Sequence, residues 1–144
     1  MDIISVFETE GGSSILSRPA IKEHMSYWGY HLILDCSNCD KSLMSNRVNV
    51  DTWIRQLVKD INMSPIGDPR IEYTAGEFPD KAGFTVVQII VTSSIVAHFV
   101  DNLGQIYLDV FSCKPFDSSV VKNSVVKHFK SAKQREYYLT RQAD

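Results

Sequence analysis

Residues 84–113 read FTVVQIIVTSSIVAHFVDNLGQIYLDVFSC, and this stretch decides the fold. Its first part, residues 84–91, is almost wholly apolar and β-branched, which is typical of a strand covered on both faces. Residues 95–100 continue in an extended conformation. The sequence Asp-Asn-Leu-Gly at 101–104 is a turn signal. We therefore expect residues 105–113 to return as the antiparallel partner of residues 95–100.

Outside this stretch, residues 30–36, 70–74 and 134–140 have the composition of strands. Residues 50–61 place apolar side chains at steps of three and four, which predicts an amphipathic helix capped by Asn49 or Asp51. A second helix is expected to begin at Asp117 or Ser118. This order predicts an α+β fold, a two-layer α/β sandwich with one antiparallel sheet and helices on one face. The other face would be free to pack against a second subunit.

The composition is that of an ordinary globular protein. The chain has 144 residues, 44% of them hydrophobic and 22% charged, with a net charge of −2. We expect an N-terminal extension at residues 1–26 and a single domain at residues 27–144. The near-neutral charge argues against nucleic-acid binding, and no apolar run reaches the roughly 20 residues that a membrane helix needs. The acidic start lacks the pattern of a signal peptide, so a cytoplasmic location is expected.

Three cysteines bear on the metal chemistry. Cys36 and Cys39 have CxxC spacing, and Cys113 is a possible third ligand. Structural zinc usually takes four ligands, and the four histidines supply no HxxxH pair to complete a site. We therefore favour free thiols and predict no metal.

Chemistry-bearing residues cluster in the stretch that decides the fold. With the turn at 101–104, paired positions sum to about 205 or 206, so Cys113 is expected opposite Thr92 or Ser93. His98 follows on the same strand as Ser93, and Thr85 lies eight residues before it. We expect these groups to gather near one strand junction. Taken singly, each also has a structural interpretation, as a hydrogen-bonded hydroxyl, a core histidine or a small buried thiol.

The order and spacing of several motifs resemble the bacterial and archaeal S-adenosylmethionine decarboxylases from about residue 29 to residue 140. That family typically has a glycine and hydroxyl residue, then a serine and histidine five apart, then a D-[VI]-F-[TS]-C motif. The matching segments are GFT at 83–85, TSSIVAH at 92–98 and LDVFSC at 108–113, together with GYHLILD at 29–35 and CD at 39–40.

The resemblance implies a self-made cofactor. Ser93 would attack the preceding carbonyl and cleave the Thr92–Ser93 bond, and the serine would become a pyruvoyl group that binds the substrate amine as a Schiff base. Thr85 matches the hydroxyl residue that supports processing, and His98 matches the residue that transfers a proton during processing. Cys113 matches the thiol that returns a proton to the substrate α-carbon. No metal is implied.

The chain departs from the family pattern around the substrate. The family's Glu before the serine is Thr92 here, and the His after it is Ser94. Residues 99–102, FVDN, replace the family's T-W-P-E, and Asp101 lies one position from the missing carboxylate. Phe78 is the candidate for the aromatic residue that stacks on adenine.

Three functions follow from these observations. The first is a self-cleaving, pyruvoyl-dependent decarboxylase of S-adenosylmethionine in polyamine (spermidine) biosynthesis, acting as a homodimer on a small-molecule substrate. The second keeps the pyruvoyl chemistry but acts on another amino acid, ornithine or arginine, as the altered segment 99–102 suggests. The third is a non-cleaving, non-catalytic homologue with a binding or regulatory role. Self-cleavage separates the two enzymes from the third.

Overall fold

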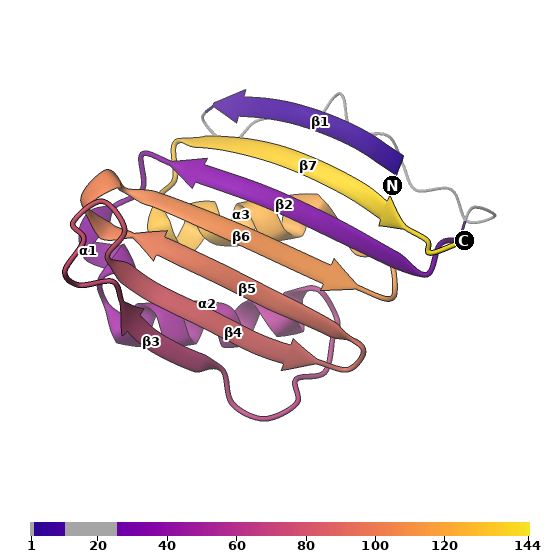
Figure 1. The fold of residues 1–144 in the computed structure, drawn as a ribbon, viewed down its shortest axis with the longest axis horizontal. Coiled ribbons are helices and arrows are strands. Elements are labelled where there is room, and N and C mark those ends of the chain that lie inside the picture. Colours follow the sequence, from indigo (N-terminus) through magenta and orange to yellow (C-terminus); the bar gives the residue numbers. More distant parts are fainter. Residues whose placement is uncertain (1, 11–25) are drawn as a thin grey trace.

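The computed structural model of the chain describes residues 2–10 and 26–144. Residues 1 and 11–25 lie outside the described residues, and with them most of the expected extension. Seven strands in the described part form one antiparallel sheet, in the order β1-β7-β2-β6-β5-β4-β3 (Figure 1). The strands are β1 (Asp2–Glu10), β2 (Gly29–Ser37), β3 (Arg70–Thr74), β4 (Gly83–Ile90), β5 (Ser93–Val100), β6 (Gln105–Ser112) and β7 (Lys133–Arg141). The helices are α1 (Lys41–Met44), α2 (Arg47–Asp60), α3 (Ser118–Phe129) and the 3₁₀ turn η1 (Asp101–Leu103).

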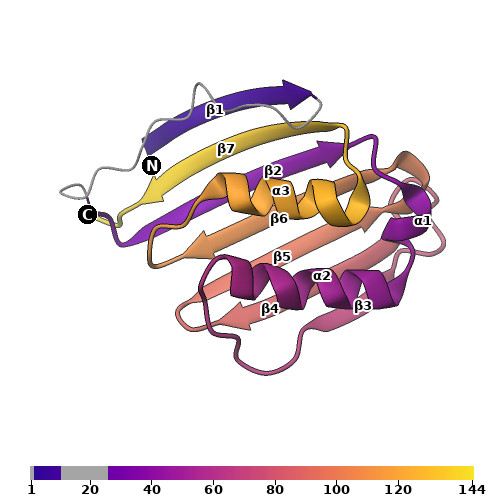
Figure 2. The same cartoon turned by 180° about the vertical axis from the view of Figure 1, so that it is seen from behind.

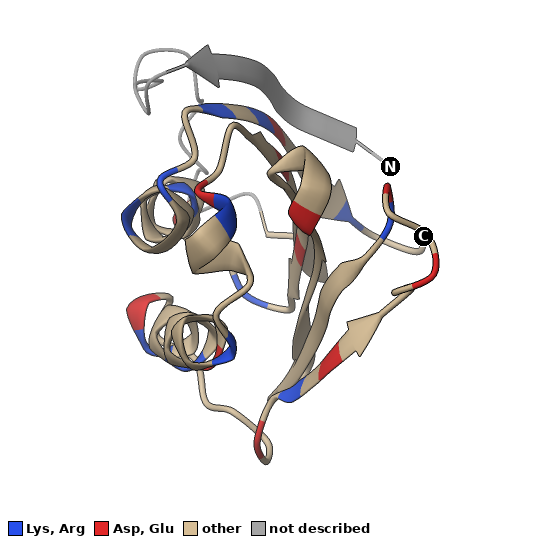
Figure 3. Ribbon diagram, turned by 90° about the vertical axis from the view of Figure 1, so that its left-hand side faces the viewer, with Lys and Arg blue, Asp and Glu red and all other residues tan. Residues whose placement is uncertain are grey.

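Helices α2 and α3 lie side by side on one face of the sheet (Figure 2). Seen along the sheet, the other face carries no described helix (Figure 3). Successive side chains of β6 point to opposite faces of the sheet. Ile106, Leu108 and Val110 are buried under the helices, whereas Tyr107 points to the other face and is 40% exposed. We call the side that carries Tyr107 the outer face. The predicted α+β two-layer sandwich is confirmed.

The apolar face of α2 packs Trp53 against Phe99 of β5 and Phe129 of α3, with ring centroids 5.8 and 5.3 Å apart. The predicted start of this helix is wrong. Asn46 is the cap, and its side chain accepts a hydrogen bond from the Asn49 backbone N–H. Because Val48 is exposed and the buried face of α2 begins at Val50, the apolar period that guided the prediction begins one turn late. The predicted Asp117 cap of α3 is confirmed.

Two tight turns set the register of the central strands. The connection from β5 to β6 is η1 followed by Gly104, whose φ of 63° lies in the left-handed region. In this hairpin the residue numbers of cross-strand partners add up to 205, as for Ser94 with Phe111 and His98 with Tyr107. The predicted hairpin is therefore confirmed. A second two-residue turn at Val91 and Thr92 joins β4 to β5, and here paired positions sum to 183.

The predicted N-terminal extension contains an element of the sheet. Strand β1 pairs with β7 from Asp2 opposite Thr140 to Glu10 opposite Lys133. It forms one edge of the sheet, and β3 forms the other. No helix among the described residues is long and apolar enough to cross a membrane.

Candidate functional site

The first group of candidate residues lies where β4 turns into β5. Thr92 has a φ of 53°, a left-handed conformation that a β-branched side chain rarely adopts. Ser93 follows directly, and its Oγ accepts a hydrogen bond from the Cys113 backbone N–H at 3.3 Å. The expectation that Cys113 lies beside Ser93 is therefore confirmed. A strained backbone, the Ser93 hydroxyl and the Cys113 backbone thus meet at one point, which we call the serine end.

A hollow of about 250 Å³ lies against the serine end. Thr92 and Cys113 line it on one side, and the turn after α2 lines it on the other. The Lys114 Nζ donates a hydrogen bond to the backbone carbonyl of Asn62 at 2.7 Å, which ties the end of β6 to that turn. The end of β6 and the turn after α2 are therefore joined across the hollow that Thr92 lines.

The second group of candidate residues lies near the other end of β5. Thr85 and His98 are cross-strand partners, with the Thr85 Oγ1 and the His98 Nδ1 3.3 Å apart. The Thr74 Oγ1 lies 3.0 Å from the Thr85 Oγ1 and donates a hydrogen bond to the Gly83 carbonyl at 3.3 Å. A side chain at position 83 would place its Cβ 1.9 Å from the Phe99 carbonyl oxygen, so only glycine allows this close approach. We call this group the histidine end.

The expected single cluster does not form within one chain. The turn at Val91 and Thr92 pairs Thr85 with His98 and leaves Ser93 at the opposite end of β5. Five residues of strand separate Ser93 from His98, which corresponds to about 16 Å. Figure 1 shows the β4–β5 turn and the β5–β6 turn at opposite ends of β5. The correction follows from strand pairing alone, because positions that sum to 183 cannot place Thr85 beside Ser93.

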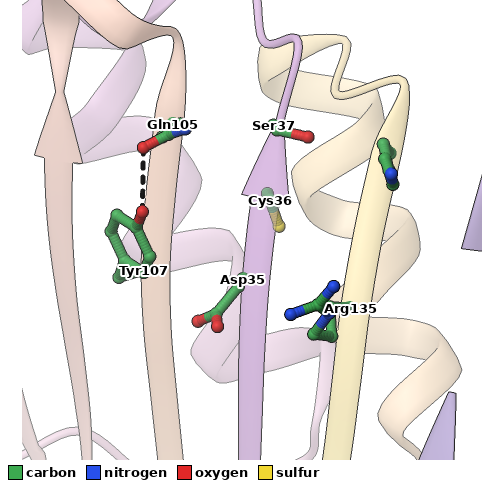
Figure 4. A pocket seen from close by; sticks show the side chains of 7 residues that line it. Asp35, Cys36, Ser37, Gln105, Tyr107 and Arg135 are labelled. Atoms are coloured by element: carbon green, nitrogen blue, oxygen red, sulfur yellow. Dashed lines mark hydrogen bonds between the residues drawn. The ribbon is translucent and has the colours of Figure 1, made fainter. Parts of the chain in front are cut away.

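A row of polar side chains crosses the outer face through the histidine end. Cross-strand pairing joins Arg135, Asp35, Tyr107 and His98 in that order. Figure 4 shows Asp35 between Tyr107 and Arg135, above a hollow of about 250 Å³, and the Tyr107 hydroxyl donates to the Gln105 side chain at 2.8 Å. Burial raises the pKa of the Asp35 carboxyl, nearby Asp109 raises it further and Arg135 partly offsets both. The row was missed because it depends on three strand pairings at once.

The turn beyond the histidine end holds Asp101. Burial raises the pKa of its carboxyl, and the neighbouring Tyr73 hydroxyl partly offsets that effect. The Asp101 Oδ1 is buried and has no hydrogen-bond partner among the described residues. Phe78 lies 58% exposed on the loop before Gly83, and the Asp101 backbone N–H donates to the Ala82 carbonyl at the end of the same loop. Phe78 and Asp101 therefore flank the histidine end.

The CxxC pair lies under the sheet. Cys36 and Cys39 are 2% and 7% exposed, and burial raises the pKa of both thiols, that of Cys39 to about 11. Thiols in such surroundings are poor nucleophiles. Within residues 2–10 and 26–144, no group of three or more His, Cys, Asp or Glu side chains is placed to hold a metal ion.

An aromatic hollow near the serine end was also missed. The Trp28 and Phe111 rings lie 6.0 Å apart, and the Arg141 guanidinium lies 5.2 Å from the centre of the Phe111 ring. The hollow that they line with the C-terminal residues measures about 440 Å³. Trp28 precedes the first predicted strand, so its exposure (56%) could not be foreseen from any strand pattern.

Two comparisons with known proteins gave a match. A family model described as S-adenosylmethionine decarboxylase matches residues 30–142, which include both ends of β5. The fold is similar to the crystal structure of the adenosylmethionine decarboxylase from Aquifex aeolicus VF5. The TM-score is 0.68 at 16% sequence identity, over 83% of this chain and 95% of that chain. No curated protein sequence matches the chain significantly.

Proposed function

The chain belongs to the S-adenosylmethionine decarboxylase family, and we propose that it is a self-cleaving, pyruvoyl-dependent enzyme that decarboxylates S-adenosylmethionine for polyamine synthesis. One observation carries the proposal: the Ser93 hydroxyl, in contact with the Cys113 N–H, directly follows the left-handed Thr92. The hydroxyl and the strained residue before it support attack by Ser93 on the peptide bond between them.

In the proposed processing, the Ser93 Oγ attacks the Thr92 carbonyl carbon and the peptide nitrogen leaves, which converts the amide into an ester. Loss of the Ser93 α-proton then expels the Thr92 carboxylate and leaves a dehydroalanine at the new N-terminus. Water converts its enamine nitrogen to ammonia and leaves the ketone of a pyruvoyl group. A left-handed, β-branched residue is strained by about 1–3 kcal/mol, and cleavage releases that strain. The residues present therefore fit self-formation of the group.

In turnover, the pyruvoyl group supplies an electron sink for the loss of CO₂. We assign to the Cys113 thiol the return of a proton to the substrate α-carbon, because its backbone is held against Ser93. Asp101, with an unpartnered buried oxygen, would accept a hydrogen bond from the substrate. Phe78 is the proposed stacking partner for adenine.

We further propose that the site is completed by a second copy. A proton-transferring side chain must come within about 3 Å of its partner atom, or one water beyond it, and about 16 Å separates Ser93 from His98. A two-fold axis that lies between two outer faces and runs across the strands would set the β4–β5 turn of one copy, with its exposed Thr92, on the histidine end of the other. The exposed stripe of Val87 and Ile89 on β4 and Val91 in the turn after it supports such burial of the outer face.

The decisive test is the intact mass of the purified protein. We expect two pieces, residues 1–92 and 93–144, and a ketone on the second piece that reacts with a hydrazine or by reductive amination. Ser93→Ala should stay full-length, while the matched control Ser94→Ala should still be cleaved. A wild-type chain that stays at one full-length mass after long incubation would identify the non-cleaving homologue instead.

The altered segment 99–102 favours one alternative, a pyruvoyl-dependent decarboxylase of ornithine or arginine. The Asp101 carboxylate is able to bind either a hydroxyl group or a cationic side chain. CO₂ release from S-adenosylmethionine, ornithine and arginine by the cleaved protein separates these substrates. Release from ornithine or arginine alone would replace the proposed substrate and leave the proposed processing intact.

A further inference from the structure

Three side chains on neighbouring strands form a continuous hydrogen-bonded series at the histidine end. Thr74 ends β3, Thr85 lies on β4 and His98 lies on β5. The Thr74 and Thr85 hydroxyl oxygens are 3.0 Å apart, and the Thr85 hydroxyl oxygen is 3.3 Å from the His98 Nδ1. The series ends at a backbone group, because the Thr74 hydroxyl donates to the Gly83 carbonyl at 3.3 Å.

The direction of each hydrogen bond in the series follows from the donor at that carbonyl. A carbonyl oxygen only accepts, so when the Thr74 hydroxyl donates to Gly83 its single proton is used there. Thr85 must then donate its own proton to the Thr74 oxygen. With its proton used, the Thr85 oxygen is left as an acceptor for the His98 Nδ1–H. The neutral imidazole therefore carries its proton on Nδ1.

Strand register holds the series in place. Thr74 is the cross-strand partner of Gly83, and Thr85 is that of both Glu72 and His98. The Gly83 backbone is itself packed so closely on Phe99 that no Cβ fits. The accepting carbonyl therefore has little freedom to turn away from Thr74.

We infer that Thr74 is a positioning residue that sets the His98 tautomer and leaves the Nε2 lone pair free as a proton acceptor. His98 is an exposed side chain, and its only described hydrogen bond is made at Nδ1. A bare Nε2 is the form that takes up a proton from a group approaching from outside the chain. The use of that lone pair in processing rests on the proposed function, whereas the tautomer itself does not.

The test measures the tautomer directly. In ¹⁵N-labelled Ser93→Ala protein, which keeps the chain in one piece, two-bond ¹⁵N–¹H correlations at alkaline pH report which ring nitrogen carries the proton. His98→Gln identifies the signal. We expect the proton on Nδ1 in this parent, the same pattern after Thr74→Ser, and a shift towards Nε2–H after Thr74→Val, which keeps the shape and loses the hydroxyl.

The second readout is the rate of self-cleavage with Ser93 restored. Loss of one aligning hydrogen bond should slow cleavage roughly three- to tenfold in Thr74→Val, and Thr74→Ser should restore it. A parent with the His98 proton on Nε2 would overturn the inference. So would Thr74→Val with an unchanged tautomer, even if cleavage slows, because the effect would then be structural only. If the His98 tautomer responds as expected but the chain with Ser93 never cleaves, the proposed function is refuted and the role of Thr74 is upheld.

Discussion

The two ends of β5 differ in what each holds. At the serine end, the Ser93 hydroxyl and the Cys113 backbone N–H meet beside a peptide bond that follows a strained residue, Thr92. At the histidine end, the Thr85 hydroxyl contacts the His98 imidazole and is itself in contact with the Thr74 hydroxyl, and the imidazole lies in a row with Tyr107 and Asp35. The first end holds groups that make and break bonds to carbon, and the second holds groups that accept and release protons.

The separation shows that neither end is sufficient for the proposed processing. Attack by Ser93 needs a base within hydrogen-bond reach, and the one hydrogen bond described for the Ser93 hydroxyl is to the Cys113 backbone N–H. The histidine end has a free imidazole nitrogen but no scissile bond. Two copies of one surface, related by a two-fold axis, would provide both parts twice.

The proposal that two copies share the site is tested most severely by mixing two variants that cannot cleave themselves. Ser93→Ala lacks the scissile serine but keeps its histidine end, and His98→Ala keeps its serine end. We expect each alone to remain essentially uncleaved and a co-expressed mixture to regain cleavage, because a mixed dimer holds one complete site. With random pairing, about a quarter of all chains should be cleaved. Differently tagged chains resolved by mass spectrometry measure this.

The identity of the cleaved chain gives the sharpest outcome. Only the His98→Ala chain should be cut, since it alone carries Ser93. Replacing the Ser93→Ala partner with a Ser93→Ala, His98→Ala double variant removes the complete site and should abolish the recovery. Equal cleavage of His98→Ala alone and in the mixture would show that each chain processes itself.

Replacing Cys113 should affect turnover, whereas replacing His98 should affect cleavage, so the two ends of β5 can be distinguished by the step that fails. Because the thiol is assigned to turnover, Cys113→Ala should still cleave but should lose roughly 10²–10⁴-fold in decarboxylation, or protonate the wrong carbon and inactivate itself. His98→Ala should instead be defective in cleavage. CO₂ release and intact mass measured on the same samples distinguish the two effects. Cys39→Ala is the control, and wild-type turnover by Cys113→Ala would remove the assignment.

The sequence was sufficient to predict the two layers of the fold, but not the separation of the candidate residues between the two ends of β5. Apolar runs and the turn at 101–104 located the central strands within a residue or two and gave the β5–β6 register. The turn at Val91 and Thr92 has no Gly, Asn or Asp, so it was read as part of a longer extended segment. Thr92 adopts the left-handed conformation without the usual signal, and that turn decides which residues meet.

Two other features depend on partners that local patterns do not reveal. The edge strand β1 exists through its pairing with β7, more than a hundred residues away, so its own sequence was read as an extension. Thr74 was not singled out because a threonine at a strand end is common. Only the pairing of β3 with β4 places its hydroxyl beside Thr85.

The reactivity of the three cysteine thiols compares the two ends of β5 without any substrate. Cys113 is half-exposed at the serine end, whereas Cys36 and Cys39 are buried towards the histidine end, with burial raising the pKa of Cys39 to about 11. At pH 8 only about one part in a thousand of such a thiol is ionised. A disulfide reagent should therefore titrate one fast thiol in the folded chain and three after unfolding. Fast reaction of the Cys113→Ala variant would show that the CxxC pair is accessible.

The smallest expected effect concerns the charge at the histidine end. Burial and Asp109 raise the pKa of the Asp35 carboxyl above its ordinary 3.8, so its ionisation costs the folded state stability at neutral pH. Asp35→Asn removes that cost and should raise the thermal midpoint at pH 7 by roughly 1–3 °C. As the pH falls through the raised pKa of Asp35, the folded wild type binds its proton before the unfolded chain does. The stability advantage of the variant should therefore shrink and vanish near pH 3.

The control is Asp80→Asn, on the exposed loop. It removes one charge away from the row and should leave the thermal midpoint within about a degree at both pH values. A loss of stability in Asp35→Asn at pH 7 would show instead that attraction to Arg135 outweighs burial, and that the row at the histidine end is held together by its charges.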